Sequence, residues 1–289
     1  MWQPAKALLL AQVLLRAVLL GTILLGGVVP ALSDGFNDVT GRKRVACHVA
    51  GAREIMLLTF GQSISANHGE APYTPHGNVV NFNPNDWLCY AAVDPLLGAT
   101  AGGDNHTGSI WGYLCDGLLE TKRWDRCIIA PIAQGQTSVK DWAPGGGQYR
   151  LIREAIARMH ASGLTPTALL WGQGEQDAIG TPDPAVYEKR FNAMADAIRP
   201  YAHAPLLVAV ETTCDFNLIN EPTRVAKRAA EQKIEEAQRA VVNPAAGIFA
   251  GPDLDRIGQD GRWDSCHLNV SGLKAAAAAW QQALLTVLQ

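Results

Sequence analysis

The sequence predicts an α/β fold, a three-layer α/β/α sandwich in which helices cover both faces of a five-stranded parallel sheet. Five apolar runs are continuous rather than alternating, a pattern typical of strands that are buried on both faces. Amphipathic helical patterns separate these runs, and strands that alternate with helices usually form a parallel sheet. With 289 residues, of which 48% are hydrophobic, the chain is long enough to bury one substantial core.

The five predicted strands are spread over most of the chain. They span residues 54–60, 127–133, 167–171, 206–210 and 247–250. The stretch 61–126 has little periodicity and is rich in Asn, Gly and Pro. We interpret it as long loops beyond the carboxyl ends of the strands, where folds of this class bind their ligands.

The predicted helices lie between and after the strands. Residues 148–162 carry an apolar stripe, and Gly163 follows where a C-cap belongs. A second helix is predicted over residues 184–199, and a long charged one begins at Asn220. Ser271 is the predicted cap of a last helix near the C-terminus.

Residues 1–33 differ from the rest of the chain. Residues 7–29 are almost wholly apolar, and small residues near Ser33 suit a signal peptidase. The apolar run is also long enough for an uncleaved membrane anchor. Arg16 in its middle favours a cleaved signal peptide. We therefore expect an exported protein, periplasmic or secreted, whose residues 34–289 form one domain and touch the membrane only if the segment is uncleaved.

Charge and cysteine content narrow the classes of partner. Without residues 1–33, which hold Lys6, Arg16 and no acid, 22 Lys and Arg face 27 Asp and Glu. This net charge of −5, with no basic run, argues against a nucleic-acid partner. The six cysteines all follow residue 33, which suggests disulfides in an oxidising compartment, with 15 possible pairings. No Cys or His spacing is typical of a metal site, so we expect no metal and no cofactor.

The first candidate for catalysis is Ser63, in the segment Gly61-Gln62-Ser63 that follows the first predicted strand. At a strand-to-helix turn the hydroxyl projects from the sheet edge, and the Ser N–H helps to form an anion site. An ordinary helix-capping serine is the structural alternative. Ser65 is the competing nucleophile, and only the position after the strand favours Ser63.

Asp264 and His267 supply the other two groups of a serine hydrolase. A serine hydroxyl needs an imidazole to take its proton, and a carboxylate fixes the imidazole tautomer. Three residues of separation let one short loop present both groups. Taken alone, such a pair is more often a structural His with a capping Asp.

Two further segments provide candidate donors for an oxyanion. The amide of Gln173, after the third predicted strand, and the backbone N–H of Gly108 are candidates alongside the N–H of Ser63. Glu175 is a supporting carboxylate that rivals Asp264 as partner of the histidine, and Gln62 is a second supporting residue. In isolation each segment is also explained as an ordinary polar turn.

Together these segments resemble the four blocks of SGNH-type hydrolases. They read Gly61-Gln62-Ser63, Gly108-Ser109, Gln173-Gly174-Glu175-Gln176-Asp177 and Asp264-x-x-His267. The first and third blocks are similar to the sialic-acid O-acetylesterase-like branch of carbohydrate esterases, and the segment from Ala130 to Ser138 is similar to a further stretch of that branch. The resemblance spans about residues 55–280 and implies the flavodoxin-like α/β/α fold of this family.

The chain departs from that branch at three positions. Ile64 follows the Ser in place of the common Asn, Gly135-Gln136 replaces Gly-Gly, and Cys266 precedes the candidate His. These differences concern the acyl pocket more than the three catalytic candidates. Cys266 is a candidate disulfide partner of Cys214, at the end of the fourth strand, in a bond that would stiffen the His loop.

The resemblance implies a serine esterase that removes O-acetyl groups from a carbohydrate through an acyl-enzyme. The expected substrate is a small-molecule or polysaccharide ester, because Asn- and Trp-rich loops suit a sugar ring more than a long acyl chain. A general short-chain or aryl esterase of the same fold is the alternative enzyme. A non-catalytic carbohydrate-binding protein that kept the cleft is the alternative outside the enzymes.

Overall fold

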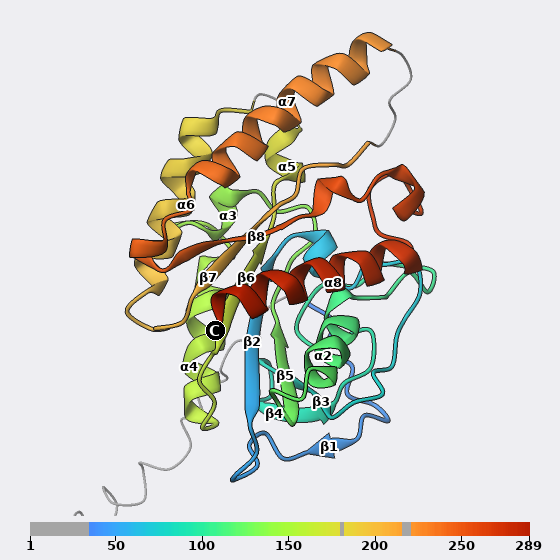
Figure 1. Cartoon of the computed structure of the whole chain (residues 1–289), viewed down its shortest axis with the longest axis vertical. Helices are drawn as coiled ribbons and strands as arrows, with labels where there is room; N and C mark the ends of the chain where they lie inside the picture. Colours follow the sequence, from blue (N-terminus) through green and yellow to red (C-terminus); the bar gives the residue numbers. More distant parts are fainter. Residues whose placement is uncertain (1–34, 180–181, 216–220) are drawn as a thin grey trace, which may run out of the picture. The chain divides into compact units, whose positions relative to one another are not determined.

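The computed structural model describes residues 35–179, 182–215 and 221–289. The predicted α/β class is confirmed, and all five predicted strands are present (Figure 1). They are β2 (Glu54–Gly61), β5 (Arg126–Pro131), β6 (Ala168–Gly172), β7 (Leu206–Val210) and β8 (Ile248–Asp253). All pair in parallel in the spatial order β5-β2-β6-β7-β8, the flavodoxin-like arrangement.

Within the described residues the sheet has eight strands, three more than the sequence predicted. β3 (Val79–Asn83) pairs in parallel with β5, and β4 (Leu88–Ala91) and β1 (Arg44–Val45) extend that edge with antiparallel pairing. β3 was hidden because Asn81 and Asn83 break its apolar run. Both asparagines are buried, and Asn81 accepts a hydrogen bond from Leu97 N–H at 2.6 Å. In β3 a buried hydrogen bond thus takes the place of the apolar side chains by which a buried strand is recognised in a sequence.

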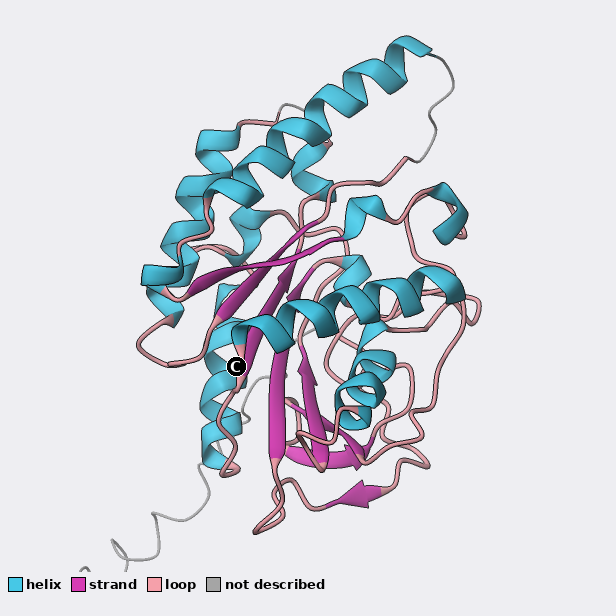
Figure 2. Cartoon of the chain, viewed as in Figure 1, coloured by secondary structure: helices cyan, strands magenta, loops and turns pink. Residues whose placement is uncertain are grey.

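The helices cover both faces of the sheet (Figure 2). One layer contains α2 (Ile110–Glu120) and α8 (Val270–Val287). The other contains α3 (Val139–Trp142), α4 (Tyr149–Ala161), α6 (Pro184–Ile198) and α7 (Glu221–Ala240). Alternate residues of β2 serve the two layers: Leu57 packs with the α2/α8 layer, and Leu58 with the α4/α6 layer.

Short elements shape the carboxyl edge of the sheet. They are η1 (Ser63–Ser65), α5 (Glu175–Ala178), η2 (Pro244–Ala246), η3 (Leu254–Arg256) and η4 (Gln259–Gly261). The predicted helices correspond to α4, α6, α7 and α8. The cap of α8 is Asn269, whose side chain accepts from Gly272 N–H, and the prediction of Ser271 was wrong. Asn220, the predicted start of α7, lies outside the described residues.

Three disulfides join the six cysteines in pairs. They are Cys47–Cys89, Cys115–Cys127 and Cys214–Cys266, the last as predicted. Disulfides persist in oxidising compartments, which fits an exported protein. In the described part of the chain, no helix has the length and apolar character needed to cross a bilayer. The proposed signal peptide, residues 1–33, lies outside the described residues.

Candidate active site

The candidate site lies where the strand order reverses. β5 lies on one side of β2 and β6 on the other, so the connections that leave the carboxyl ends of β2 and β6 run in opposite directions. Such switch points are where open α/β sheets bind ligands. Ser63 follows β2 and Gln173 follows β6, so parallel pairing alone brings these two segments to the same edge.

Two glycines set the path of the chain into Ser63. Gly61 has φ 129°, and a Cβ built on it would lie 1.8 Å from the carbonyl oxygen of Gly172. The same Gly172 oxygen accepts the N–H of Gln62 at 2.9 Å. No other residue fits this close approach of β2 and β6 at a positive φ. The turn then places Ser63 as the first residue of η1, where its N–H makes no hydrogen bond within the described residues.

Ser63, His267 and Asp264 form a continuous hydrogen-bonded chain. Ser63 Oγ lies 2.9 Å from His267 Nε2, and His267 Nδ1 lies 2.7 Å from Asp264 Oδ2. This network fits the tautomer with the proton on Nδ1, donated to Asp264, and with Nε2 accepting from the hydroxyl. Ser63 is only 7% exposed. The structure thus brings together the three residues that the sequence singled out as acid, base and nucleophile.

The backbone around Asp264 explains why its carboxylate meets the histidine. Asp264 Oδ1 accepts the N–H of His267 at 2.6 Å and that of Cys266 at 3.0 Å. Ser265 between them has φ 67°, which tightens the turn. One carboxylate oxygen therefore holds the loop, while the other orients the imidazole.

Two further contacts fix the His loop to its surroundings. The disulfide ties Cys266 to Cys214, just beyond β7. The buried guanidinium of Arg262 donates to the carbonyl oxygens of Cys266 and Thr213. A buried guanidinium bonded to carbonyls across a loop restricts movement of both segments. Sequence reasoning did not identify this role for Arg262, because its partner Thr213 comes from a distant position in the chain.

Gln62 and Gln173 form an internal amide network. Gln173 is fully buried, and its Nε2 lies 3.2 Å from Gln62 Oε1, 3.1 Å from Thr137 O and 2.6 Å from Asp177 Oδ2. Gln62 Oε1 also accepts the N–H of Gln176. Because the Gln173 amide is already directed at internal acceptors, it ties β2 to the segment after β6.

Gly108 lies beside the segment that follows η1. Its N–H donates to the carbonyl oxygen of Gly69 at 3.0 Å, and Gly69 N–H donates back at 2.8 Å. A Cβ on Gly108 would lie 2.1 Å from Ala71 O, so the close packing requires glycine. The N–H of Gly108, a predicted oxyanion donor, is therefore already used in a hydrogen bond that joins two loops.

The carboxylate that faces His267 Nδ1 is that of Asp264, at 2.7 Å, rather than that of its rival Glu175. Glu175 is buried, its Oε2 accepts Gly174 N–H at 3.0 Å, and it lies against Glu211. Burial raises the pKa of Glu175 to about 7. Burial and the neighbouring Glu175 raise the pKa of Glu211 well above its ordinary value. Burial of the pair therefore favours the protonated form of both carboxyl groups.

His68 is a site residue that the sequence did not indicate. Its ring stacks on that of His267, with 5.3 Å between centroids, and its Nε2 lies 3.2 Å from Thr100 Oγ1. Burial, followed by repulsion from His267, lowers the pKa of His68 to about 4. The neutral ring therefore forms a wall of the site. The only feature of the sequence that could have pointed to His68 is its position five residues after Ser63.

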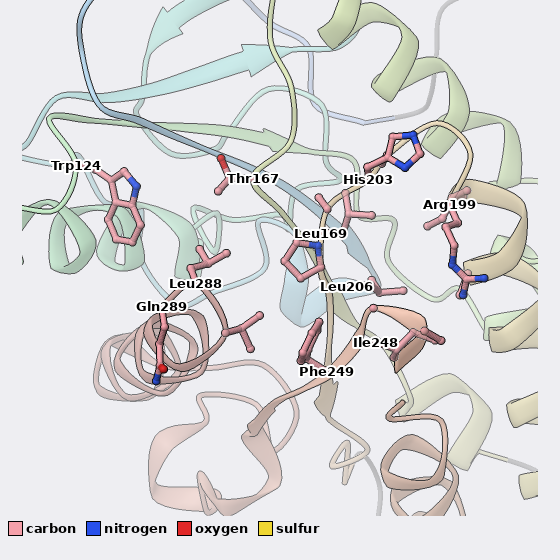
Figure 3. A pocket seen from close by; sticks show the side chains of 18 of the residues that line it. Trp124, Thr167, Leu169, Arg199, His203, Leu206, Ile248, Phe249, Leu288 and Gln289 are labelled. Carbon is pink, nitrogen blue, oxygen red and sulfur yellow. The ribbon is translucent and has the colours of Figure 1, made fainter. Parts of the chain in front are cut away.

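A cavity of about 720 Å³ lies away from this site, at the amino ends of β6, β7 and β8 (Figure 3). Thr167, Leu206 and Ile248 contribute to its wall at the strand starts, with Trp124 and Leu288 nearby. None of the three triad candidates lines it. Because ligands of open α/β sheets bind at carboxyl ends, its size does not make it the catalytic centre.

Comparison with known proteins extends these observations. A family model described as carbohydrate esterase, sialic acid-specific acetylesterase, matches residues 59–285. No curated protein matches the chain. A protein of Arabidopsis thaliana is similar in structure, with TM-score 0.63 and 17% identity over 81% of this chain and 98% of its own.

Two further solved structures share the fold. NanS has TM-score 0.55 and 16% identity over 83% of this chain and 98% of its own. A carbohydrate acetylesterase of Xanthomonas citri has TM-score 0.51 and 14% identity, and the match covers 81% of this chain and 56% of that protein. At these identities the likeness shows the fold alone.

Proposed function

Because the chain belongs to the carbohydrate esterase family of sialic acid-specific acetylesterases, and is thus a carboxylic ester hydrolase, we propose that Ser63, His267 and Asp264 hydrolyse an acetyl ester of a carbohydrate. Family membership confirms the resemblance that the sequence blocks suggested. The observation that carries the mechanism is the unbroken path from Ser63 Oγ through His267 to Asp264, with contacts of 2.9 and 2.7 Å.

The proposed reaction has two halves. His267 Nε2 takes the proton of Ser63 as Oγ attacks the ester carbonyl, and it then protonates the departing sugar hydroxyl. Water attacks the acetyl-enzyme by the same route and releases acetate. Asp264 holds the Nδ1–H tautomer and stabilises the imidazolium that forms in each half.

The tetrahedral intermediate needs donors for its oxyanion. We assign the N–H of Ser63 as one donor, because it has no acceptor among the described residues. The loop after β5 supplies a second candidate. Gln134 N–H in this loop donates to Gly61 O at 3.0 Å, and two residues on, Gln136 has φ 61° and an N–H without an acceptor in the described part of the chain. Gln173 and Gly108 then act as supports for the segments around Ser63.

The competing serine is unsuited to the reaction. Ser65 is 0% exposed, whereas the Oγ of Ser63 lies within hydrogen-bond distance of His267 Nε2. Its Oγ makes no hydrogen bond to any described residue, so no base activates it. This favours Ser63 as the nucleophile.

The decisive experiment compares Ser63→Ala with Ser65→Ala. We expect Ser63→Ala to abolish release of acetate from acetylated xylo-oligosaccharides, O-acetylated sialic acid and p-nitrophenyl acetate, with an unchanged melting temperature. Ser65→Ala should keep activity within about threefold, because it removes only a buried hydroxyl that has no partner. Undiminished hydrolysis by Ser63→Ala would refute the assignment.

A further inference from the structure

A cluster of aromatic side chains borders His267, on the side where the proposed mechanism places the substrate. We call His68, His106 and Trp263 the aromatic ledge. The Trp263 ring stacks on that of His106, with 3.9 Å between centroids and 7° between planes. The Trp263 ring also lies 6.0 Å from that of His267, at 23°, and His68 stacks on His267 at 5.3 Å. The mechanism above uses none of these three rings.

The ledge is held in place by bonds among three loops. Trp263 Nε1 donates to the carbonyl oxygen of His68 at 3.2 Å. His106 Nδ1 lies 3.1 Å from the carbonyl oxygen of Glu70. Trp263 N–H donates to His267 O at 2.9 Å, so the tryptophan and the base share one closed turn. The indole therefore has a fixed position relative to Nε2 before any substrate binds.

Trp263 is nevertheless 37% exposed, although burial is the usual outcome for an indole. The loop that carries His106 is also solvent-exposed, and it is strained. Asp104 and Asn105 are exposed and have φ 52° and 67°. Consecutive left-handed residues other than glycine are uncommon and cluster at functional sites. An exposed apolar ring bordered by a polar loop matches a surface that binds a ring with hydroxyl groups.

The direction of proton transfer places the alcohol part of the ester near this ledge. His267 Nε2 must come within hydrogen-bond reach of the departing oxygen, so the alcohol lies on the imidazole side and the oxyanion lies toward the backbone donors. We propose that the solvent-exposed part of the Trp263 indole binds the pyranose ring that carries the ester. The C–H face of such a ring packs on an aromatic surface by dispersion and by loss of water.

This inference rests on the proposed esterase function but has a separate test. The enzyme is assayed with ethyl acetate, whose alcohol has no ring, and with the better hydrolysed of acetylated xylo-oligosaccharide and O-acetylated sialic acid. Trp263→Ala should lower kcat/KM for the sugar ester about tenfold, mainly through KM, because one stacking contact is lost. Ethyl acetate hydrolysis should stay within about twofold, and Trp263→Phe should recover most of the sugar activity.

Trp87→Ala is the matched control. Trp87 is 43% exposed and packs over the Arg158 guanidinium of α4, and its replacement should leave both activities unchanged. An equal loss on both esters in Trp263→Ala would show that the indole only supports His267, and it would overturn the inference. The inference would also be overturned if the enzyme hydrolysed ethyl acetate in a Ser63-dependent way but hydrolysed neither sugar ester faster. The esterase function would stand in that case. Loss of Ser63 dependence would instead remove the proposed function.

Discussion

Replacing Asp264 separates its proposed catalytic role from its structural role. In Asp264→Asn the amide oxygen can still accept the two N–H groups, of His267 at 2.6 Å and of Cys266 at 3.0 Å. The amide nitrogen then faces Nδ1 as a donor, which moves the imidazole proton to Nε2, the atom that must accept from Ser63. The wrong tautomer typically lowers kcat about 10⁴-fold in triads of this kind. We expect that loss with a melting temperature within about 2 °C of wild type.

Asp264→Ala is the companion variant, because it also removes the acceptor of both N–H groups. Each donor left unpaired costs about 1 kcal/mol, the low end of the usual range, since the Asp264 side chain is 17% exposed and water can reach it. A loss of about 2 kcal/mol lowers the melting temperature by roughly 4–8 °C in a chain of this size. Thermal unfolding and p-nitrophenyl acetate rates measure the two effects. Activity of Asp264→Asn within tenfold of wild type would refute the reasoning.

Two more predictions concern stability. The double variant Cys214→Ser/Cys266→Ser should lower the free energy of unfolding in urea by about 4 kcal/mol, because the bond spans 52 residues of sequence, and an unchanged midpoint would contradict this. In Glu211→Gln, the dependence of stability on pH should flatten. Burial raises the pKa of Glu175 to about 7, and burial and the neighbouring Glu175 raise the pKa of Glu211 well above its ordinary value, so the folded state binds protons more tightly than the unfolded one. Wild-type stability from this pair is therefore full below about pH 4.3 and declines as pH rises through 7. Melting temperatures of the wild type and of Glu211→Gln are measured from pH 5 to 9. If they changed with pH by the same amount in both proteins, the prediction would be refuted.

The residues of the proposed catalytic triad were predictable because their placement depends on local rules. Ser63 follows a continuous apolar strand, and Asp264 and His267 are three residues apart in one turn. Parallel pairing brings carboxyl strand ends to one edge whatever the loop sequences are. The oxyanion candidates were less predictable, because the availability of the Gly108 N–H depends on Gly69, a partner from another loop. Strand β3 was missed for a similar reason, since the buried Asn81 side chain bonds to Leu97, a partner from another segment.

The buried carboxyl pair lies beyond any local rule, and its position suggests what it supports. Glu175 follows β6 and Glu211 follows β7, so only the sheet brings them together. A Cβ on Gly172 would lie 2.8 Å from Glu211 Oε2, which shows that this carboxyl group packs directly behind the end of β6. Gly172 is the residue whose carbonyl oxygen accepts Gln62 N–H and fixes the approach to Ser63. A charged pair there would be costly, whereas a protonated pair fills the space without uncompensated charge. Burial therefore favours the protonated forms of these acids, which pack behind the turn that presents Ser63.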